Sequence, residues 1–379
     1  MRVLMLKFSG AALFCVFLLF VSACGNKMPD ETKQIAKAQK VYDKKGLDGF
    51  YEYVKNGGMY FAVKDSSQNG ATPLLISIKN GEIEKARLFF QKGALPNEKD
   101  FHEQDILDYA FLYYDTLKDV WGADCLYYYD IARSYSEMLE FVVSNIPVSY
   151  WHSCDFNGKC PLVKIIEQCQ NFDITKRCID LVKDVNQVDC EGKSFLMYAA
   201  QCNVDVRVLK YLLDKGAEID LKNGNEWTAL MYAARYNPNP SVMEDLILRG
   251  ASMEENSVGL TITMLASCNS NPGVLMTLLK YKKEINSSTK QGKTALMYAC
   301  ENNQNYSLIK ILIDNGVNIE ASDFEGKTAR EYLSENSALS TSDIAMIWNS
   351  SKHSDEIITD DKNLDSADIN VEQNNIAGE

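Results

Sequence analysis

The feature that most constrains this chain is a nine-residue motif that recurs at nearly constant spacing. The motif reads GKSFLMYAA from Gly192, EWTALMYAA from Glu226, GLTITMLAS from Gly259 and GKTALMYAC from Gly292. Successive starts are 34, 33 and 33 residues apart. A fixed period of this size is typical of small structural units that cannot bury an apolar face alone and must stack on their neighbours. We therefore expect an array of units rather than one central core.

The same frame continues in both directions along the chain. Downstream it reaches Gly326. Upstream it reaches Gly158, then a degraded copy at Glu103, and then Gly70. The interval of 55 residues between Glu103 and Gly158 places an irregular insertion at about 111–135, which we expect to be an elongated helix pair or a projecting loop. A half-matched unit precedes Gly70. We count about nine units over residues 35–335.

Each unit has the signals of two short helices. A hydroxyl residue that can cap the first helix follows the start of most motifs, at Thr72, Ser194, Thr228, Thr294 and Thr328. Apolar residues then recur at helical spacing, as in Val208, Leu209, Leu212 and Leu213. Glycines at 93, 216, 250 and 316 are placed to end the second helix in a left-handed conformation. The fold class predicted is all-α.

The motif and its period resemble the ankyrin repeat, whose pattern G-x-T-P-L-x-x-A and later L-L-x-x-G-A is matched over most of the chain. The resemblance implies a solenoid of stacked helix pairs joined by hairpin-like loops, which binds other proteins. One departure is clear, because Met197, Met231, Met297 and Leu75 stand where the family usually has a histidine that ties down the loop. Apolar packing would have to replace that hydrogen bond.

The N-terminus has the organisation of an export signal. Arg2 and Lys7 precede the uncharged apolar stretch 8–21, which is shorter than the ~20 residues needed to span a bilayer. The stretch ends in Val21-Ser22-Ala23-Cys24, which resembles the lipobox of bacterial lipoprotein precursors. That resemblance implies cleavage before Cys24, a diacylglycerol on its sulfur, and a fatty acyl group such as palmitate on the new N-terminus. The alternatives are an ordinary secretory signal or an uncleaved anchor.

The remaining cysteines allow a second function. Nine of them follow Cys24, and six lie between Cys154 and Cys202. In an exported chain such a cluster can hold disulfides, and His152-x-Cys154 with Cys160 weakly resembles a metal site, although buried thiols explain most positions equally well. We expect no metal and no cofactor. A redox- or metal-responsive module built on this cluster is the alternative function.

Composition and motifs argue against catalysis and against nucleic-acid binding. The chain has three histidines, no GxSxG, P-loop or HExxH motif, and a net charge of −13 without a basic stripe. We expect a protein-interaction scaffold rather than an enzyme, and an effector acting on host proteins remains a further alternative.

The partner surface is expected on the hairpin tips and the ends of the first helices. The repeat beginning at Glu226 carries Trp227, Arg235 and Tyr236, the residue types enriched in binding hot spots. Leu260 in the next tip would extend the apolar centre, while Lys193 and Lys293 would form a charged rim. Gln201, Asn269 and Glu301 are further helix-end candidates.

These observations give a domain layout. We expect a signal peptide at 1–23, a tether at 24–34, the repeat domain at 35–335, and a C-terminal segment at 336–379 with an acidic, disordered tail. The protein would be lipid-anchored on the non-cytoplasmic side of a bacterial cell envelope. Gly25, rather than Asp, after the lipidated residue weakly favours the outer membrane.

Lipidation can be tested directly on Cys24. Because only a thiol forms the thioether, Cys24→Ala should leave unprocessed precursor and abolish labelling by a fatty-acid probe. Metabolic labelling of the wild-type chain and of Cys15→Ala, whose cysteine lies within the apolar stretch, provides the comparison. Undiminished labelling of the Cys24 variant would rule out the lipobox interpretation.

Overall fold

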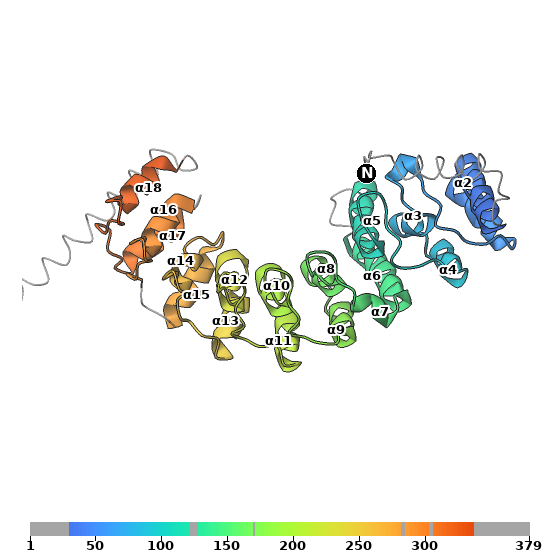
Figure 1. Cartoon of the computed structure of the whole chain (residues 1–379). Helices are drawn as coiled ribbons and strands as arrows, with labels where there is room; N and C mark the ends of the chain where they lie inside the picture. Colours follow the sequence, from blue (N-terminus) through green and yellow to red (C-terminus); the bar gives the residue numbers. More distant parts are fainter. Residues whose placement is uncertain (1–29, 122–127, 170, 282–284, 303–305, 337–379) are drawn as a thin grey trace, which may run out of the picture. The chain divides into compact units, whose positions relative to one another are not determined.

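The computed structural model describes residues 30–121, 128–169, 171–281, 285–302 and 306–336. Over these residues the chain forms seventeen α-helices and one 3₁₀ turn with no β-strand, so the all-α prediction is confirmed (Figure 1). None of the described helices combines the length and the apolar character needed to cross a membrane. Cys24, the export signal and the acidic tail lie outside the described residues.

The helices fall into two compact units. The first, here the N-terminal unit, ends at Cys190 and also takes in Asp214–Gly216, and the second, the C-terminal unit, consists of Glu191–Leu213 and the chain from Ala217 onward. The helices of the N-terminal unit are α2 (Asp30–Lys55), α3 (Pro73–Lys79), α4 (Ile83–Gln91), α5 (Ile106–Trp121), α6 (Tyr128–Asn145), α7 (Val148–Trp151), α8 (Pro161–Gln168) and α9 (Phe172–Leu181), with the 3₁₀ turn η1 at Ser66–Gln68.

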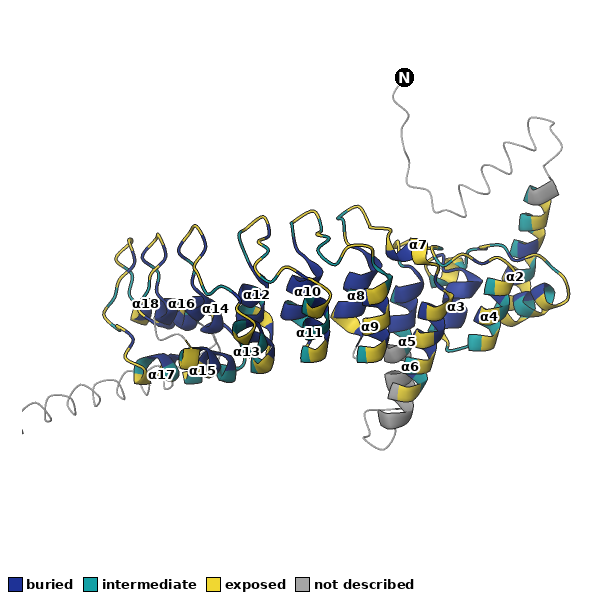
Figure 2. Cartoon of the chain, turned by 90° about the horizontal axis from the view of Figure 1, so that it is seen from below, coloured by how far each residue is buried: buried dark blue, intermediate teal, exposed yellow. Residues whose placement is uncertain are grey.

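The C-terminal unit consists of five regular repeats as far as it is described. Its helices are α10 (Phe195–Cys202), α11 (Val206–Asp214), α12 (Ala229–Tyr236), α13 (Pro240–Leu248), α14 (Ile262–Ala266), α15 (Pro272–Tyr281), α16 (Ala295–Asn302), α17 (Tyr306–Asp314) and α18 (Ala329–Glu335). The first helix of a pair is buried on most of its surface, whereas the second exposes one side (Figure 2). Stacked first helices therefore form the core of this unit.

The hydroxyl caps expected at the first helices are present. In five repeats the cap oxygen accepts a hydrogen bond from the backbone N–H three residues later, namely at Thr72, Ser194, Thr228, Thr261 and Thr294. At Thr328 the backbone N–H donates to the Glu331 carboxylate at 2.6 Å, which anchors the same turn from the other side. These contacts fix where each first helix begins.

The loops are held by side chains that the sequence analysis did not identify. Five hairpins begin with an Asp or Asn whose Oδ1 accepts hydrogen bonds from the N–H groups two and four residues later, at Asp100, Asp155, Asn223, Asn256 and Asp323. Thr289 makes the second of these bonds with its hydroxyl, which accepts from the Lys293 N–H at 3.2 Å. Such turns hold the tip locally, so the histidine missing from the motif is not needed for that purpose.

Adjacent repeats are also joined by buried asparagines. Asn237 Nδ2 donates to the carbonyls of Ala200 and Asn203 at 3.0 and 2.9 Å, and Asn269 Nδ2 donates in the same way to Ala234 and Asn237, at 2.9 Å in both cases. Both asparagines are fully buried. Each therefore satisfies carbonyls at the end of the preceding first helix that would otherwise be buried without a partner.

The N-terminal unit departs from the regular pattern in two places. α2 begins at Asp30, inside the expected tether, because its residues are good helix formers and Ala38 and Tyr42 are buried against the unit. The helix is broken at Gly46, where φ is +65°. α5 and α6 are 16 and 18 residues long, so the described part of the insertion is an elongated helix pair, the first of the two expected forms.

Removing one buried asparagine should weaken the contact between two repeats. Asn237→Ala leaves the carbonyls of Ala200 and Asn203 without this donor, and we expect the free energy of unfolding to fall by about 1–3 kcal/mol. Urea unfolding followed by circular dichroism measures the loss. Asn225→Ala, at an exposed tip position, is the control and should change stability by less than about 0.5 kcal/mol. Equal effects of the two variants would contradict the role assigned to Asn237.

Candidate protein-binding surface

Three positions recur along one edge of each repeat of the C-terminal unit. The tip position is the second residue of the motif, the ring position follows five residues later in the first helix, and the end position eight residues later. One set of three residues from one repeat is here called a rung. The five rungs are Lys193/Tyr198/Gln201, Trp227/Tyr232/Arg235, Leu260/Leu265/Cys268, Lys293/Tyr298/Glu301 and Lys327/Tyr332/Glu335.

The lysine rungs are closed by contacts within the protein. Lys293 Nζ lies 2.7 Å from the Glu301 carboxylate, and 5.2 and 4.5 Å from the ring centroids of Tyr298 and Tyr332. Lys327 repeats the arrangement with Glu335 at 2.5 Å and Tyr332 at 4.0 Å. The hydrogen bond to Glu335 raises the pKa of Lys327. A cation over an aromatic face is attracted by the ring quadrupole. Lys293 therefore joins its own rung to the tyrosine of the next rung.

Lys193 differs from what the sequence led us to expect. Its side chain is 8% exposed, its Nζ lies 3.9 and 4.5 Å from the ring centroids of Tyr198 and Tyr232, and it donates a hydrogen bond to Gln201. The expectation of an exposed, charged rim is therefore wrong for Lys193, because tyrosines of two successive repeats cover its ammonium group. Sequence could not show this, since the second ring comes from the next repeat.

The Trp227 rung lies beside an exposed aromatic side chain, that of Tyr236, which follows its end position. Trp227 packs on Tyr232 and Tyr236 with centroid separations of 5.2 and 6.1 Å, and the Tyr236 side chain is 48% exposed at the end of α12. Arg235 Nη1 donates to the Cys268 carbonyl at 2.5 Å, and its guanidinium carbon lies 5.4 Å from the Tyr236 ring centroid. The structure thus brings Trp227, Arg235 and Tyr236 together as expected, but Arg235 is also a link to the next repeat.

The next rung is apolar. Leu260 is half-buried at the tip, and Leu265 and Cys268 behind it are buried. Among the rung positions, the next charged residue after Arg235 is therefore Lys293. Asn269, which was expected among the exposed helix ends, is fully buried in the contact between repeats, so that expectation is wrong.

The tyrosines of the surface are tied to the loops that carry the tips. Tyr332 donates to Asp323 Oδ2 at 2.7 Å, and Tyr232 accepts from Asn223 Nδ2 at 2.9 Å. The hydrogen bond to Asp323 raises the pKa of Tyr332 and lowers that of Asp323. The residue that orders each hairpin thus also orients a ring, which gives the surface a fixed geometry.

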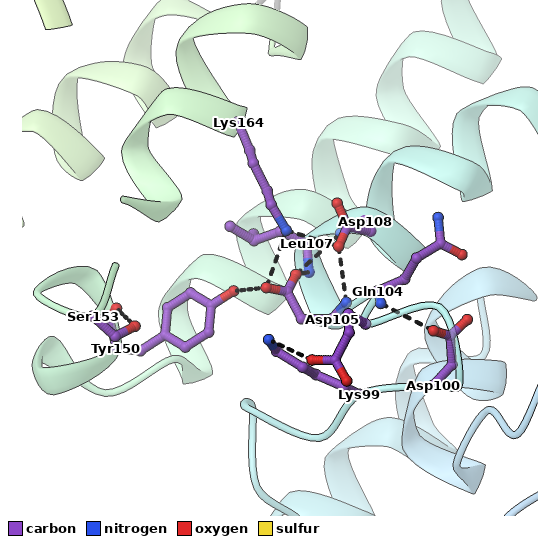
Figure 3. Close-up of polar contacts among 10 residues, drawn as sticks. Lys99, Asp100, Gln104, Asp105, Leu107, Asp108, Tyr150, Ser153 and Lys164 are labelled. Carbon is purple, nitrogen blue, oxygen red and sulfur yellow. Dashed lines mark hydrogen bonds and ion pairs between the residues drawn. The ribbon is translucent and has the colours of Figure 1, made fainter. Parts of the chain in front are cut away.

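The N-terminal unit uses the ring position for a partly buried ionic network (Figure 3). Lys164 lies 3.1 Å from Asp105 and 2.7 Å from Asp108, and Tyr150 donates to Asp105 at 2.8 Å. Burial and then the charge of Asp105 raise the pKa of Asp108. Burial alone would lower the pKa of Lys164, but the two carboxylates outweigh it and the pKa is raised. The network pins α8 to the start of α5.

A cavity of about 580 Å³ adjoins this network in the N-terminal unit. Its lining includes Asp105, Tyr150, Cys154, Cys160 and Lys164. None of the eight described cysteines is in a disulfide bond. Within the described residues, no three His, Cys, Asp or Glu side chains are grouped so that they could hold a metal ion.

Comparison with known proteins identifies the class. A family model for ankyrin repeats in three copies matches residues 130–223, 164–254 and 230–323, which together cover more than half of the 379 residues. The chain belongs to the ankyrin-repeat family. Ankyrin repeats are protein-interaction modules and are typically not catalytic.

Two particular similarities accompany the family match. The chain is 28% identical over 166 residues to the ankyrin repeat domain-containing protein OPG015 of monkeypox virus, over 40% of this chain and 34% of the viral protein. It therefore spans about a third of the length of that relative. It is also similar to a chain in the solved complex of the predatory endopeptidase Bd0816 of Bdellovibrio bacteriovorus with the immunity protein Bd3460, with 27% identity, a TM-score of 0.42, and coverage of 52% of this chain and 99% of that one.

The ionic network makes stability depend on pH in a defined direction. Lys164→Met removes the cation that faces Asp105 and Asp108, and we expect a loss of about 2 kcal/mol at pH 7, less than for a fully buried pair because Lys164 is partly exposed. The pKa of Asp108 is raised in the folded state, so the folded protein takes up that proton first as the pH falls. The deficit of the variant should therefore shrink between pH 7 and pH 4.

Urea unfolding at both pH values measures this effect. Lys159→Met, which removes an exposed lysine from the tip of the same repeat, is the matched control and should show little loss at either pH. A deficit of the Lys164 variant that stays constant with pH would argue against the network.

Proposed function

We propose that this chain is a protein-interaction scaffold whose partner docks on the Trp227 rung, and that a lipid on Cys24 holds it at a bacterial membrane. The observation that carries the binding proposal is the half-exposed Tyr236 ring beside Trp227. In the lysine rungs, by contrast, the lysine is hydrogen-bonded to the Gln or Glu of the same rung. The Trp227 rung and Tyr236 offer aromatic groups of the types enriched in hot spots, and the rung beside them adds apolar surface.

The surface is suited to binding because its parts are already ordered. Trp227 N–H is held by Asn223 Oδ1 at 2.9 Å, and Asn223 also contacts the ring position through Tyr232. Asn237 and Asn239 flank the turn after α12, where Pro240 begins the next helix. A partner that covers Trp227 and Tyr236 would therefore immobilise few additional torsions, so less binding energy is lost to ordering.

The neighbouring rungs favour a partner with an apolar centre. Leu260 extends the Trp227 surface on one side, and Lys193 is covered on the other. Lys293 remains half-buried and paired with Glu301, so its effect on a partner would be electrostatic at the edge. The net charge of −13 would attract a partner with a positive periphery and increase the association rate.

The membrane part of the proposal is supported by the lipobox-like sequence ending at Cys24. α2 begins at Asp30, six residues later. Six residues span at most about 20 Å when fully extended, so a lipid on Cys24 would keep the N-terminal unit close to the bilayer. Two or more acyl chains would make the attachment stable. We propose the non-cytoplasmic side of the envelope, with the outer membrane favoured by Gly25.

The binding surface can be tested once a partner has been captured from cross-linked membranes. Trp227→Ala and Tyr236→Ala should each weaken binding at least about tenfold, an effect of ~1.4 kcal/mol, while the helical content stays unchanged. Phe156→Ala is the matched control, since it removes an aromatic side chain that is 94% exposed at a hairpin tip of the N-terminal unit. Binding by titration calorimetry and circular dichroism give the two readouts.

One outcome would move the site elsewhere. If both variants bind normally, and substitutions at Tyr127, Tyr128 and Tyr129 abolish binding instead, the insertion is the recognition element. Tyr127 lies outside the described residues, and Tyr128 and Tyr129 are the first two residues of α6.

A further inference from the structure

Two cysteines flank one hairpin tip of the N-terminal unit. Cys154 and Cys160 enclose the tip residues 155–159, immediately before α8. Their Sγ atoms are 2.6 Å apart, Cys154 is exposed, and Cys160 is 2% exposed. A disulfide bond measures about 2.05 Å between sulfurs, so little movement separates the two thiols from a bond.

Backbone hydrogen bonds close the tip between the two residues. The Asp155 N–H donates to the Lys159 carbonyl at 3.0 Å, and the Gly158 N–H donates to the Asp155 carbonyl at 3.0 Å. The same two positions in later repeats, Ser288/Thr294 and Ser322/Thr328, form antiparallel bridges. Directly opposed residues in such pairs have Cα atoms about 4.5–5.5 Å apart, which lies within the range of about 4.4–6.8 Å for disulfides.

A cysteine at position 160 does not cap the following helix as the hydroxyl residues of other repeats do. Six repeats have Ser or Thr here, and in five of them the hydroxyl caps the first helix. Cys160 makes no side-chain hydrogen bond to the start of α8. The helix thus lacks a stabilising cap that its sister repeats possess, and a thiol stands instead where it meets a second thiol.

We propose that Cys154 and Cys160 are a thiol-modification site that forms an intramolecular disulfide by exchange with a small-molecule or protein disulfide. The bond cross-links the base of the hairpin tip and fixes the wall of the 580 Å³ cavity that both cysteines line with Lys164. The proposal concerns the N-terminal unit and does not rest on the Trp227 surface or on the lipid anchor.

The two cysteines have different roles in the exchange. The exposed Cys154, whose sulfur accepts a hydrogen bond from Gln187 Nε2 at 3.0 Å, loses its proton and attacks one sulfur of the donor disulfide. The donor S–S bond breaks, its other half leaves as a thiolate, and a mixed disulfide forms on Cys154. Cys160 then loses its proton, attacks Cys154 Sγ and expels the second half of the donor.

Two cysteine thiols are thereby oxidised to one disulfide, and the donor disulfide is reduced to two thiols that take up the two protons. Burial, and then the contact with Cys154, raise the pKa of Cys160 to about 12. Cys160 therefore contributes little thiolate by itself and is suited to the second step, in which its partner sulfur is already adjacent.

Peptide mapping of the full chain tests the proposal. The protein is incubated with oxidised glutathione, remaining thiols are alkylated, and the sample is digested with trypsin without reduction. Cleavage after Arg133, Lys159 and Lys164 separates the two cysteines into peptides 134–159 and 160–164. We expect these two peptides to be recovered linked by a disulfide, and to separate on reduction.

Two variants keep the test decisive. Cys160→Ser restores the hydroxyl found at Ser194, so the fold should be retained, and glutathione should persist on Cys154 at a level at least about tenfold above wild type. Cys154→Ser should give neither the linked peptides nor glutathione on Cys160. Circular dichroism confirms the helical content of both. The proposal is overturned if folded wild-type protein gives no linked peptide, links Cys154 to another cysteine such as Cys190, or accumulates as much mixed disulfide as Cys160→Ser.

Discussion

The structure depends on the inability of a single helix pair to bury its own apolar surface. In the C-terminal unit most apolar residues of the first helices are buried, and stacking on neighbouring repeats supplies this burial (Figure 2). Buried polar groups also find their hydrogen-bond partners in the neighbouring repeat. Asn237 and Asn269 satisfy carbonyls of the preceding repeat, and the Gly224 N–H donates to the Glu191 carbonyl at 2.9 Å between successive tips. Stability and rigidity are therefore properties of neighbouring repeats rather than of any one of them.

This dependence leaves the outer edge of the tips and first helices free to vary. Tip, ring and end positions recur at the same spacing, so the residue types at these positions largely decide what each rung presents. In a rung of Lys, Tyr and Glu the lysine contacts the other two side chains, as Lys293 does with Tyr298 and Glu301. Trp227 with Tyr236 leaves an aromatic surface uncovered. A protein-binding surface can thus arise by substitution at a few positions without altering the stack.

The N-terminal unit shows the same frame adapted to other chemistry. At the ring position Lys164 replaces tyrosine and enters a network with Asp105, Asp108 and Tyr150 (Figure 3). At the cap position Cys160 replaces a hydroxyl and meets Cys154 across the hairpin. Both changes give up an interaction that the regular repeats use, and both place reactive or charged groups around one cavity. The tip of this repeat is therefore where we expect pH and thiol chemistry to act on the fold.

The sequence by itself determined the period, the all-α class, the hydroxyl caps and the helix pairs, because these follow from local spacing and from residues within one repeat. It also placed Trp227, Arg235 and Tyr236 on one edge, since all three belong to one helix and its tip. Only the tertiary structure decided which polar residues are buried. Lys193 is covered by Tyr232 of the next repeat, Asn269 reaches back to the previous one, and Lys164 finds Asp105 across 59 positions of sequence. Those contacts join residues of different repeats, and the pattern within one repeat does not reveal which side chain its neighbour will bring.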